Sequence, residues 1–248
     1  MKSVMKVFAG TDIGKARETN QDYYYVSKNA DNIKLCVLAD GMGGYTGGEV
    51  ASNLAVASAK SYIYSNYEKT EKTVEEIINL LKDATQYANM IVYEKTKEIP
   101  ELGEMGTTLE IALIVEDKMY ISHVGDSRIY KIRDGKIDRI TSDHSYVENL
   151  IQDGTITEEE AKYHPKKNML TKALGCTAFV EPDLLVEKFI ENDIILICSD
   201  GLTNMLSEEE IVRVIQENPD NPNRALILAA NKEGGMDNIT VIVIKDED

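Results

Sequence analysis

Five aspartates in this chain lie beside apolar runs, at positions where strand ends could bring their carboxylates together. One alone is typical of a turn or a helix cap, because an Asp side chain accepts hydrogen bonds from the nearby backbone. Several carboxylates at about 4 Å repel each other by about 4 kcal/mol per pair at an effective dielectric constant of about 20, so a cluster of five requires a cation. All-oxygen ligands suit Mg²⁺ or Mn²⁺ rather than zinc. The five are Asp22, Asp40, Asp126, Asp200 and Asp237.

The most unusual of these positions is Asp40, because five glycines follow it within eight residues. The stretch 37-VLADGMGGYTGGEVAS-52 is compatible with a phosphate-binding loop, a metal site or a plain tight turn. A nucleotide-binding loop is disfavoured, because there is no GxGxxG pattern and no Lys-Ser/Thr pair closes the loop. The metal site and the tight turn both remain open on these residues alone.

Histidine and cysteine do not indicate a second kind of metal site. The chain has three His, scattered along its length, and three Cys, none in CxxC spacing. His123 lies in an apolar run and is predicted to pack in the core, whereas His144 is predicted to cap a helix or lie in a loop. Cys36 and Cys198 also lie in apolar runs, which indicates buried thiols of a reducing compartment rather than a disulfide frame.

Length and charge limit the class of protein. The 248 residues contain no linker, repeat or low-complexity segment, which favours a single domain over residues 1–248. A formal net charge of −16 argues against nucleic acid and anionic membranes as partners, because both need a basic patch. The chain has no apolar run near the length of a membrane span, and its first residues, MKSVMKVFAG, have no apolar core of the length expected for a signal peptide. We therefore expect a cytoplasmic protein without a membrane span.

The elements that must position the aspartates can be located from periodicity. Apolar runs predict eight strands, and Arg133-Asp134-Gly135-Lys136 predicts a hairpin turn. Helices are predicted over 47–66, from the capping box Thr73–Glu76, from the capping box Ser207–Glu210, and near 221–232. This order favours sheets packed on each other with helix pairs outside. The predicted strands are 5–12, 33–40, 107–115, 118–126, 127–135, 184–190, 193–200 and 238–245.

The predicted helices also have predicted buried faces. In the helix over 47–66 we expect Val50, Leu54, Ala57 and Ile63 to share the core face. In the helix after Thr73, the residues at helical spacing are Ile77, Leu80, Leu81, Ala84, Tyr87, Ala88 and Ile91.

Six short motifs, taken in order, resemble the bacterial branch of the PPM-type metal-dependent serine/threonine protein phosphatases, also called type 2C. The resemblance runs from about residue 7 to residue 245. It implies an α+β fold: a four-layer αββα sandwich of two antiparallel sheets flanked by helix pairs, with a dinuclear metal site at one end. It also implies a flap subdomain at about 145–175. The motifs are 17-RETNQD-22, 40-DGMGG-44, 106-GTT-108, 124-VGDSR-128, 199-SDGL-202 and 237-DN-238.

The resemblance assigns roles to individual residues. It implies that two Mn²⁺ or Mg²⁺ ions are held by the carboxylates of Asp22, Asp40, Asp200 and Asp237 and by the backbone carbonyl of Gly41. Asp40 is the catalytic carboxylate that bridges both ions. Asp126 resembles the ligand of a third, weaker ion. Arg17 resembles the catalytic guanidinium that binds the substrate phosphate, and its planar fork matches phosphate.

One position departs from the wider family. Many eukaryotic members have a His two residues after the Asp of the DG motif, and that His has been assigned as the general acid. Here the position is Met42, which has no proton to donate. The bacterial branch commonly has Met there. A metal-bound water and His144 are the two alternatives for the acid.

The resemblance also implies a function. The chain is expected to hydrolyse phosphoserine and phosphothreonine on proteins by direct attack of a metal-bridging water. The expected partners are phosphorylated proteins, including an opposing bacterial Ser/Thr kinase and its substrates, and the expected state is a monomer. One alternative is a phosphatase dedicated to a single regulatory phosphoprotein. A catalytically dead binding relative is disfavoured, because Arg17 and all five acids are present.

Overall fold

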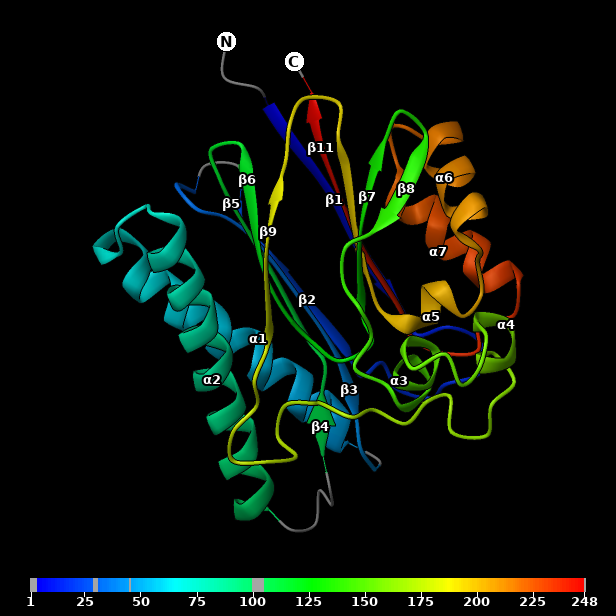
Figure 1. Ribbon diagram of the computed structural model, residues 1–248, viewed down its shortest axis with the longest axis horizontal. Coiled ribbons are helices and arrows are strands. Elements are labelled where there is room, and N and C mark those ends of the chain that lie inside the picture. The colour runs from blue at the N-terminus through cyan, green and yellow to red at the C-terminus, as the bar shows by residue number, and fades with distance from the viewer. Residues whose placement is uncertain (1–3, 29–30, 45, 100–104, 248) are drawn as a thin grey trace.

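The computed structural model describes residues 4–28, 31–44, 46–99 and 105–247. Their strands form two antiparallel sheets that pack face to face (Figure 1). In one sheet the strand order is β1 (Val4–Asp12), β11 (Ile239–Glu247), β10 (Ile194–Cys198), β7 (Arg128–Arg133), β8 (Lys136–Arg139). In the other the order is β2 (Asp22–Val26), β3 (Lys34–Met42), β5 (Leu109–Val115), β6 (Lys118–Val124), β9 (Asp183–Lys188), and the short β4 (Gly106–Thr107) pairs with β3.

Helix pairs cover the outer faces of both sheets, which gives the predicted four-layer αββα sandwich (Figure 1). Helices α1 (Gly47–Asn66) and α2 (Val74–Glu98), joined through the 3₁₀ helix η1 (Tyr67–Lys69), pack on the sheet that contains β3. Helices α6 (Glu208–Glu217) and α7 (Pro222–Lys232) pack on the sheet that contains β11. Three short helices lie at one end: α3 (Tyr146–Gln152), α4 (Glu158–Ala161) and α5 (Asp200–Thr203).

Strand β11 shows why its sequence is an almost continuous apolar run. Successive side chains of a strand point to opposite faces of the sheet. Val241 and Val243 face the core under α6 and α7, whereas Ile242 and Ile244 face the core between the two sheets. Both faces are therefore buried, so both sets of positions must be apolar.

The predicted helices are present, but their detailed contacts differ in part from the predictions. The capping box of Ser207 and Glu210 is complete, whereas at α2 Thr73 accepts from the Glu76 amide without the reciprocal bond. The predicted core face of α1 is wrong at Ala57, which is exposed. Small or apolar residues surround this helix on most sides, so the sequence pattern alone does not select a face. The residues that are buried are Gly47, Gly48, Ala51, Ser52, Ala55, Val56, Ala59 and Ile63.

The sheets confirm the predicted turn and add three strands that were not predicted, namely β2, β8 and the two-residue β4. Asp134 and Gly135 have φ values of 52° and 75°, and two positive φ values in a two-residue turn are the mark of a type I′ hairpin. The turn joins β7 to β8, and β8 had not been predicted. Strand β2 was also missed, because its sequence DYYYV does not alternate and it lies at the edge of its sheet.

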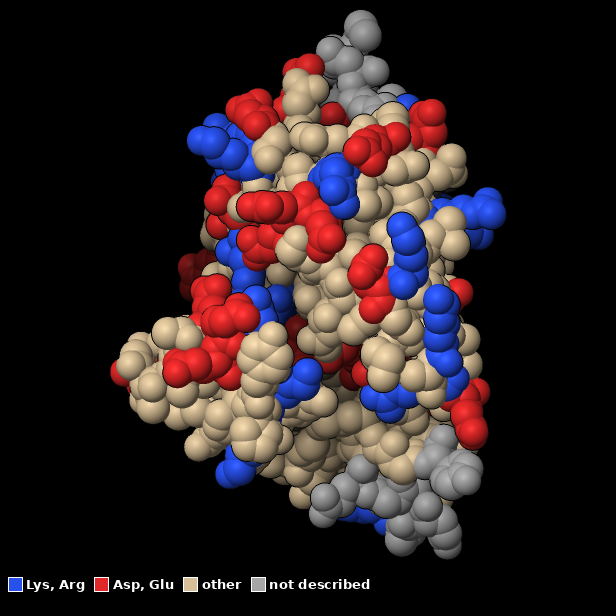
Figure 2. Space-filling model, turned by 90° about the vertical axis from the view of Figure 1, so that its right-hand side faces the viewer, with Lys and Arg blue, Asp and Glu red and all other residues tan. Residues whose placement is uncertain are grey.

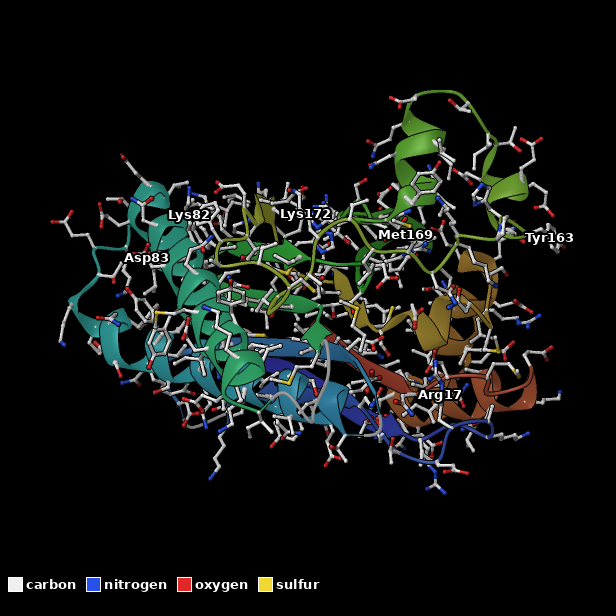
Figure 3. The ribbon with its side chains drawn as sticks, turned by 90° about the horizontal axis from the view of Figure 1, so that it is seen from below. Arg17, Lys82, Asp83, Tyr163, Met169 and Lys172 are labelled. Carbon is white, nitrogen blue, oxygen red and sulfur yellow. The ribbon has the colours of Figure 1, made fainter. Side chains whose placement is uncertain are left out.

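No helix among the described residues is long and apolar enough to cross a membrane. Helices α3 and α4 and the turns around them project from one side of the sandwich, as the view from below shows (Figure 3). This projecting segment lies within the range 145–175.

Candidate metal centre

Asp22 and Asp40 face each other because their strands pair in a fixed register. Asp22 is the first residue of β2, and its antiparallel partner in β3 is Asp40. Asp22 is buried, with only 5% of its surface exposed. Its Oδ2 accepts a hydrogen bond of 2.7 Å from Ser199 Oγ, whereas its Oδ1 has no hydrogen-bond partner. The bond to Ser199 joins the two sheets, since Ser199 follows β10 in the opposite sheet.

Two more acids come from that opposite sheet. Asp200 is the first residue of α5, directly after β10, and its Oδ2 accepts from Asn204 Nδ2 at 3.0 Å. Asp237 precedes β11, and its Oδ2 accepts from Arg17 Nη2 at 2.7 Å. The Asn238 amide donates to Asp237 Oδ1 at 2.8 Å. Each sheet therefore contributes two of the four predicted core ligands.

The fifth acid lies at the edge of an open cavity. Asp126 follows a bend at Gly125, whose φ of 117° favours glycine. Asp126 and Asp200 line a cavity of about 670 Å³, together with residues of the projecting α3–α4 segment such as Tyr163. Figure 2 shows a hollow beside that segment, with acidic side chains at its base. The side of the acidic cluster that contains Asp126 and Asp200 is therefore accessible from solvent through this cavity.

The acids change each other's ionisation. Burial is the largest cause that raises the pKa of Asp22 to about 7, of Asp126 to about 8 and of Asp200 to about 6. Burial also raises the pKa of Asp40 well above its usual value, followed by the charges of the other four acids. The charges of neighbouring acids thus oppose the ionisation of Asp22, Asp40, Asp126 and Asp200, as expected of a cluster without enough cationic partners.

The residues present fit a pair of hard divalent cations. The donor set consists of oxygens, and the partnerless Oδ1 of buried Asp22 is a polar atom that needs a ligand. Arg17 is the one basic side chain seen bonded to these five acids among the described residues. In that same part of the chain, no three Asp, Glu, His or Cys side chains already surround one point closely enough to ligate an ion. The donor set therefore supports the binding of metal ions.

Gly41 is required at its position by close backbone packing. A Cβ on Gly41 would lie 2.0 Å from the carbonyl oxygen of Gly48, where the end of β3 passes the start of α1. Its amide donates to the carbonyl of Gln21 at 3.0 Å. This steric contact explains why position 41 is a glycine. The resemblance implies, in addition, that the carbonyl of Gly41 binds a metal ion. The ligand role of the carbonyl stays a prediction.

The GTT motif holds the backbone of Asp40. Thr107 Oγ1 donates to the Asp40 carbonyl at 2.9 Å, and the Asp40 amide donates to Thr108 Oγ1 at 2.9 Å. Thr108 Oγ1 is also hydrogen-bonded to Ser127 Oγ at 2.8 Å. The sequence showed this motif through its resemblance to the family, but no role had been assigned to it. Ser199 was missed in the same way, although it lies within the quoted 199-SDGL-202.

Arg17 lies on the loop between β1 and β2, on the α7 side of the sandwich (Figure 3). Its side chain is 52% exposed and is paired with Asp237. The hydrogen bond to Asp237 is the largest cause that raises the pKa of Arg17. The predicted phosphate-binding residue thus lies next to one of the predicted metal ligands, with half of its surface open to solvent.

The two central histidines are held by other residues. His123 is fully buried, as predicted, with Nδ1 2.5 Å from Glu110 Oε1 and Nε2 2.8 Å from the Ser142 carbonyl. His144 stacks on it at 4.6 Å, accepts from the Gly125 amide through Nδ1, and has Nε2 3.1 Å from Asp183 Oδ1. Burial is the main cause that lowers the pKa of His144 to about 4. These contacts disfavour His144 as the general acid.

The αββα sandwich with an acidic centre at one end is the architecture of PPM-type phosphatases. Residues 9–223 match the family described as protein phosphatase 2C. The chain is 40% identical to a putative protein phosphatase 2C-type of Streptococcus pyogenes, over 98% of both chains. It is 38% identical to the serine/threonine phosphatase stp of Listeria monocytogenes, over 95% of this chain and 93% of that one.

Solved structures agree with this likeness. The serine/threonine phosphatase of S. agalactiae superposes with a TM-score of 0.90 at 40% identity, over 98% of this chain and 100% of that one. The catalytic domain of the phosphatase PstP in complex with two manganese ions superposes with a TM-score of 0.86 at 34% identity, over 99% of this chain and 100% of that one. The chain belongs to the protein phosphatase 2C family.

Proposed function

We propose that this chain removes phosphate from phosphoserine and phosphothreonine on proteins, with two Mn²⁺ or Mg²⁺ ions in the acidic centre. The observation that carries this proposal is the cross-strand pair of Asp22 and Asp40, with the partnerless Asp22 Oδ1 among acids whose charges raise the pKa of Asp40. The relatives named as serine/threonine phosphatases, and the relative that binds two manganese ions, support it.

The proposed ligands are Asp22, Asp40, Asp200, Asp237 and the carbonyl of Gly41, with Asp126 as a ligand of a third, weaker ion. Bound divalent ions would lower the pKa of a coordinated water, so that hydroxide is available near neutral pH, and would polarise the phosphate ester. Asp40 would be a ligand at the centre of this donor set. Its backbone is fixed on both sides by Thr107 and Thr108, which limits the freedom of its carboxylate.

Arg17 would bind the phosphate group of the substrate. A guanidinium presents parallel N–H donors that match two phosphate oxygens. In the structure Arg17 is bonded to Asp237 through Nη2 and is half exposed, so other donors of the same fork face away from that bond. We propose that Arg17 keeps its place near Asp237 while it holds an equatorial oxygen of the phosphate.

We propose that residues 145–175 act as a flap subdomain that contacts the protein substrate. The segment lines the cavity that leads to Asp126 and Asp200. The segment also carries apolar side chains that are exposed to solvent: Tyr163 is 80% exposed and Met169 is 48% exposed (Figure 3). Exposed apolar residues beside a site are typical of surfaces that contact another protein.

The finer features of this function also belong to the proposal. An opposing bacterial Ser/Thr kinase would supply the substrates, and the chain would act as a monomer in the cytoplasm. The buried thiols of Cys36 and Cys198 are compatible with a reducing compartment.

A metal-dependent phosphatase assay tests the proposal. Purified protein should release phosphate from phosphoserine and phosphothreonine peptides with Mn²⁺ or Mg²⁺, should act weakly on matched phosphotyrosine peptides, and should stop after EDTA. Activity should return when Mn²⁺ is added in excess of the chelator. Full turnover in EDTA would contradict the metal-dependent mechanism, and a preference for phosphotyrosine would contradict the proposed substrate class.

A further inference from the structure

The loop that carries Arg17 is fastened to the segment that carries Asp237. We name residues 13–19 the Arg17 loop and residues 233–238, between α7 and β11, the connector. The amides of Lys15 and Ala16 both donate to the carbonyl of Gly235, at 2.7 and 3.2 Å. Two backbone hydrogen bonds therefore attach the Arg17 loop to the connector, which lies near the other end of the chain.

The side chain of Asn238 closes this attachment. Its Nδ2 donates to the carbonyls of Ile13 at 2.9 Å and Thr19 at 3.0 Å, which are the two ends of the Arg17 loop. Its Oδ1 accepts from the amide of Gln21 at 2.8 Å, one residue before Asp22. Asn238 is 5% exposed, and both of its amide hydrogens and its oxygen are engaged.

Glycines allow other backbone segments to approach the connector closely. A Cβ on Gly14 would lie 2.2 Å from the carbonyl oxygen of Asp237, and one on Gly201 would lie 1.9 Å from the carbonyl oxygen of Asn238. Asp237 and Asn238 are thus packed between the Arg17 loop and the start of α5. In this position a small shift of the connector would move Asp237, the Arg17 loop and the start of α5 together.

We propose that Asn238 is a positioning residue that fixes the Arg17 loop relative to Asp237 and so sets where the guanidinium meets the substrate phosphate. The role requires two donors and one acceptor on one short, planar side chain. Asp has the same shape but no donor, Ser has a single donor, and Gln is longer by one methylene. The kinetic consequence rests on the proposed function, whereas the attachment of the loop does not.

The attachment can be tested without catalysis, because Lys15 and Arg17 make the loop a substrate for trypsin. Both side chains are exposed, yet cleavage needs the backbone to open locally, and the cleavage rate follows the open population. Asn238→Asp keeps the acceptor for Gln21 and loses both donors. We expect cleavage after Lys15 and Arg17 to accelerate by at least about fivefold, the change that corresponds to one lost net hydrogen bond.

Two further variants keep this test decisive. Asn218→Asp makes the same chemical change at an exposed Asn that also donates to a backbone carbonyl, that of Val214, far from the loop along the chain. It should leave the cleavage of the Arg17 loop unchanged. Asn238→Ser should give an intermediate rate, and it replaces Asn238→Asp in the comparison if the latter does not fold. Cleavage unchanged in both Asn238 variants, or raised equally along the whole chain, would overturn the proposal.

Kinetics then separate positioning from general structure. With saturating Mn²⁺, Asn238→Asp should raise the KM for p-nitrophenyl phosphate and weaken inhibition by inorganic phosphate by a similar factor, with a smaller change in kcat. In an Arg17→Ala background the same change should have little further effect on KM, because coupled residues are not additive. Full additivity would overturn the role through Arg17. An inactive wild-type protein would refute the proposed function and leave the trypsin comparison valid.

Discussion

At Asp40 the chain places a carboxylate where four other acids act on it, and then fixes its backbone by hydrogen bonds on both sides. The hydroxyls of Thr108 and Thr107 bond the amide and the carbonyl of Asp40, so its carboxylate would be available to bind a cation. Ser199 plays a comparable part for Asp22, where one oxygen is bonded and the other is left without a partner. At the scale of single residues, the site thus separates the atoms that hold the fold from the atoms left for chemistry.

Asp40→Asn is expected to remove nearly all turnover. The amide keeps the size of the side chain but loses the charge that would bridge two ions. We expect kcat with Mn²⁺ to fall by at least about a hundredfold, more than the loss typical of residues that only orient metal ligands. Asp220→Asn, an exposed acid elsewhere, is the matched control and should keep full activity. A rate near that of the wild type for Asp40→Asn would refute the assignment.

Arg17→Ala is expected to act mainly on KM. Loss of a charge-assisted hydrogen bond to phosphate costs about 1.5–3 kcal/mol, which corresponds to about a 10- to 150-fold rise in KM for a phosphopeptide. Arg17→Lys should recover part of this loss, because it keeps the charge but not the planar fork. Initial rates over a range of peptide concentrations separate KM from kcat, and an unchanged KM would argue against phosphate binding by Arg17.

At the scale of elements, the site is built where strand ends meet loops from distant parts of the chain. The positions of Asp40, Asp126, Asp200 and Asp237 were predicted from apolar runs, because strands buried on both faces, such as β10 and β11, are visible as continuous apolar sequence; Asp22 begins β2 and was indicated by its motif. Of the missed strands, β2 and β8 are edge strands with no such pattern, and β4 has only two residues. The core face of α1 was also predicted incorrectly at Ala57, which is exposed, because small residues lie on several sides of this helix and the sequence does not show which side is buried.

The residues that hold the acids in place could not be predicted in this way. Gln21 and Asn238 are 217 residues apart along the chain, and Asp40 and Thr108 are 68 apart. Their contacts are hydrogen bonds to backbone atoms, which leave no periodic signal in sequence. The motifs that contain these residues marked them as part of a family pattern without revealing what they bond.

Thr108→Val tests the attachment of β3 to the GTT segment. Valine has nearly the same shape but cannot accept from the Asp40 amide, and a buried donor without a partner costs about 1–3 kcal/mol. The melting temperature should fall by about 2–4 °C per kcal/mol for a chain of this size. Thr108→Ser keeps the hydroxyl and should lose less. Equal melting temperatures for Thr108→Val and the wild type would show that this bond adds no stability.

At the scale of the whole molecule, a net charge of −16 and a cluster of buried and half-buried acids both oppose the compact state at alkaline pH. The cluster lies where the two sheets come together, so its ionisation acts on the packing of one sheet against the other. Divalent ions should therefore affect stability as well as catalysis.

We expect the chelated protein to lose stability as the pH rises from about 6 to about 8. The pKa values of Asp22, Asp126 and Asp200 in the folded chain are about 7, 8 and 6, above the ordinary value of 3.8. A group with a raised folded pKa stabilises fully below its unfolded pKa, and this contribution is lost as the pH passes its folded pKa. Thermal melts in EDTA across this range would measure the loss.

Two controls identify the cause of that loss. Saturating Mn²⁺ should reduce or reverse the slope, because the ion favours the ionised carboxylates and binds only the folded state well. Asp126→Asn removes one of the raised groups and should make the slope in EDTA smaller. A melting temperature that stays constant, or rises, from pH 6 to pH 8 in EDTA would contradict the prediction.

The hydrogen bond between Asp22 and Ser199 joins sheets that each supply two of the four core acids. Ions bound there would link the two sheets at one end of the sandwich. Their loss would therefore increase the population of opened chains, which cellular proteases degrade. A cell short of manganese would then lose the phosphatase itself as well as its turnover. Phosphate on its protein substrates would then persist longer under metal starvation.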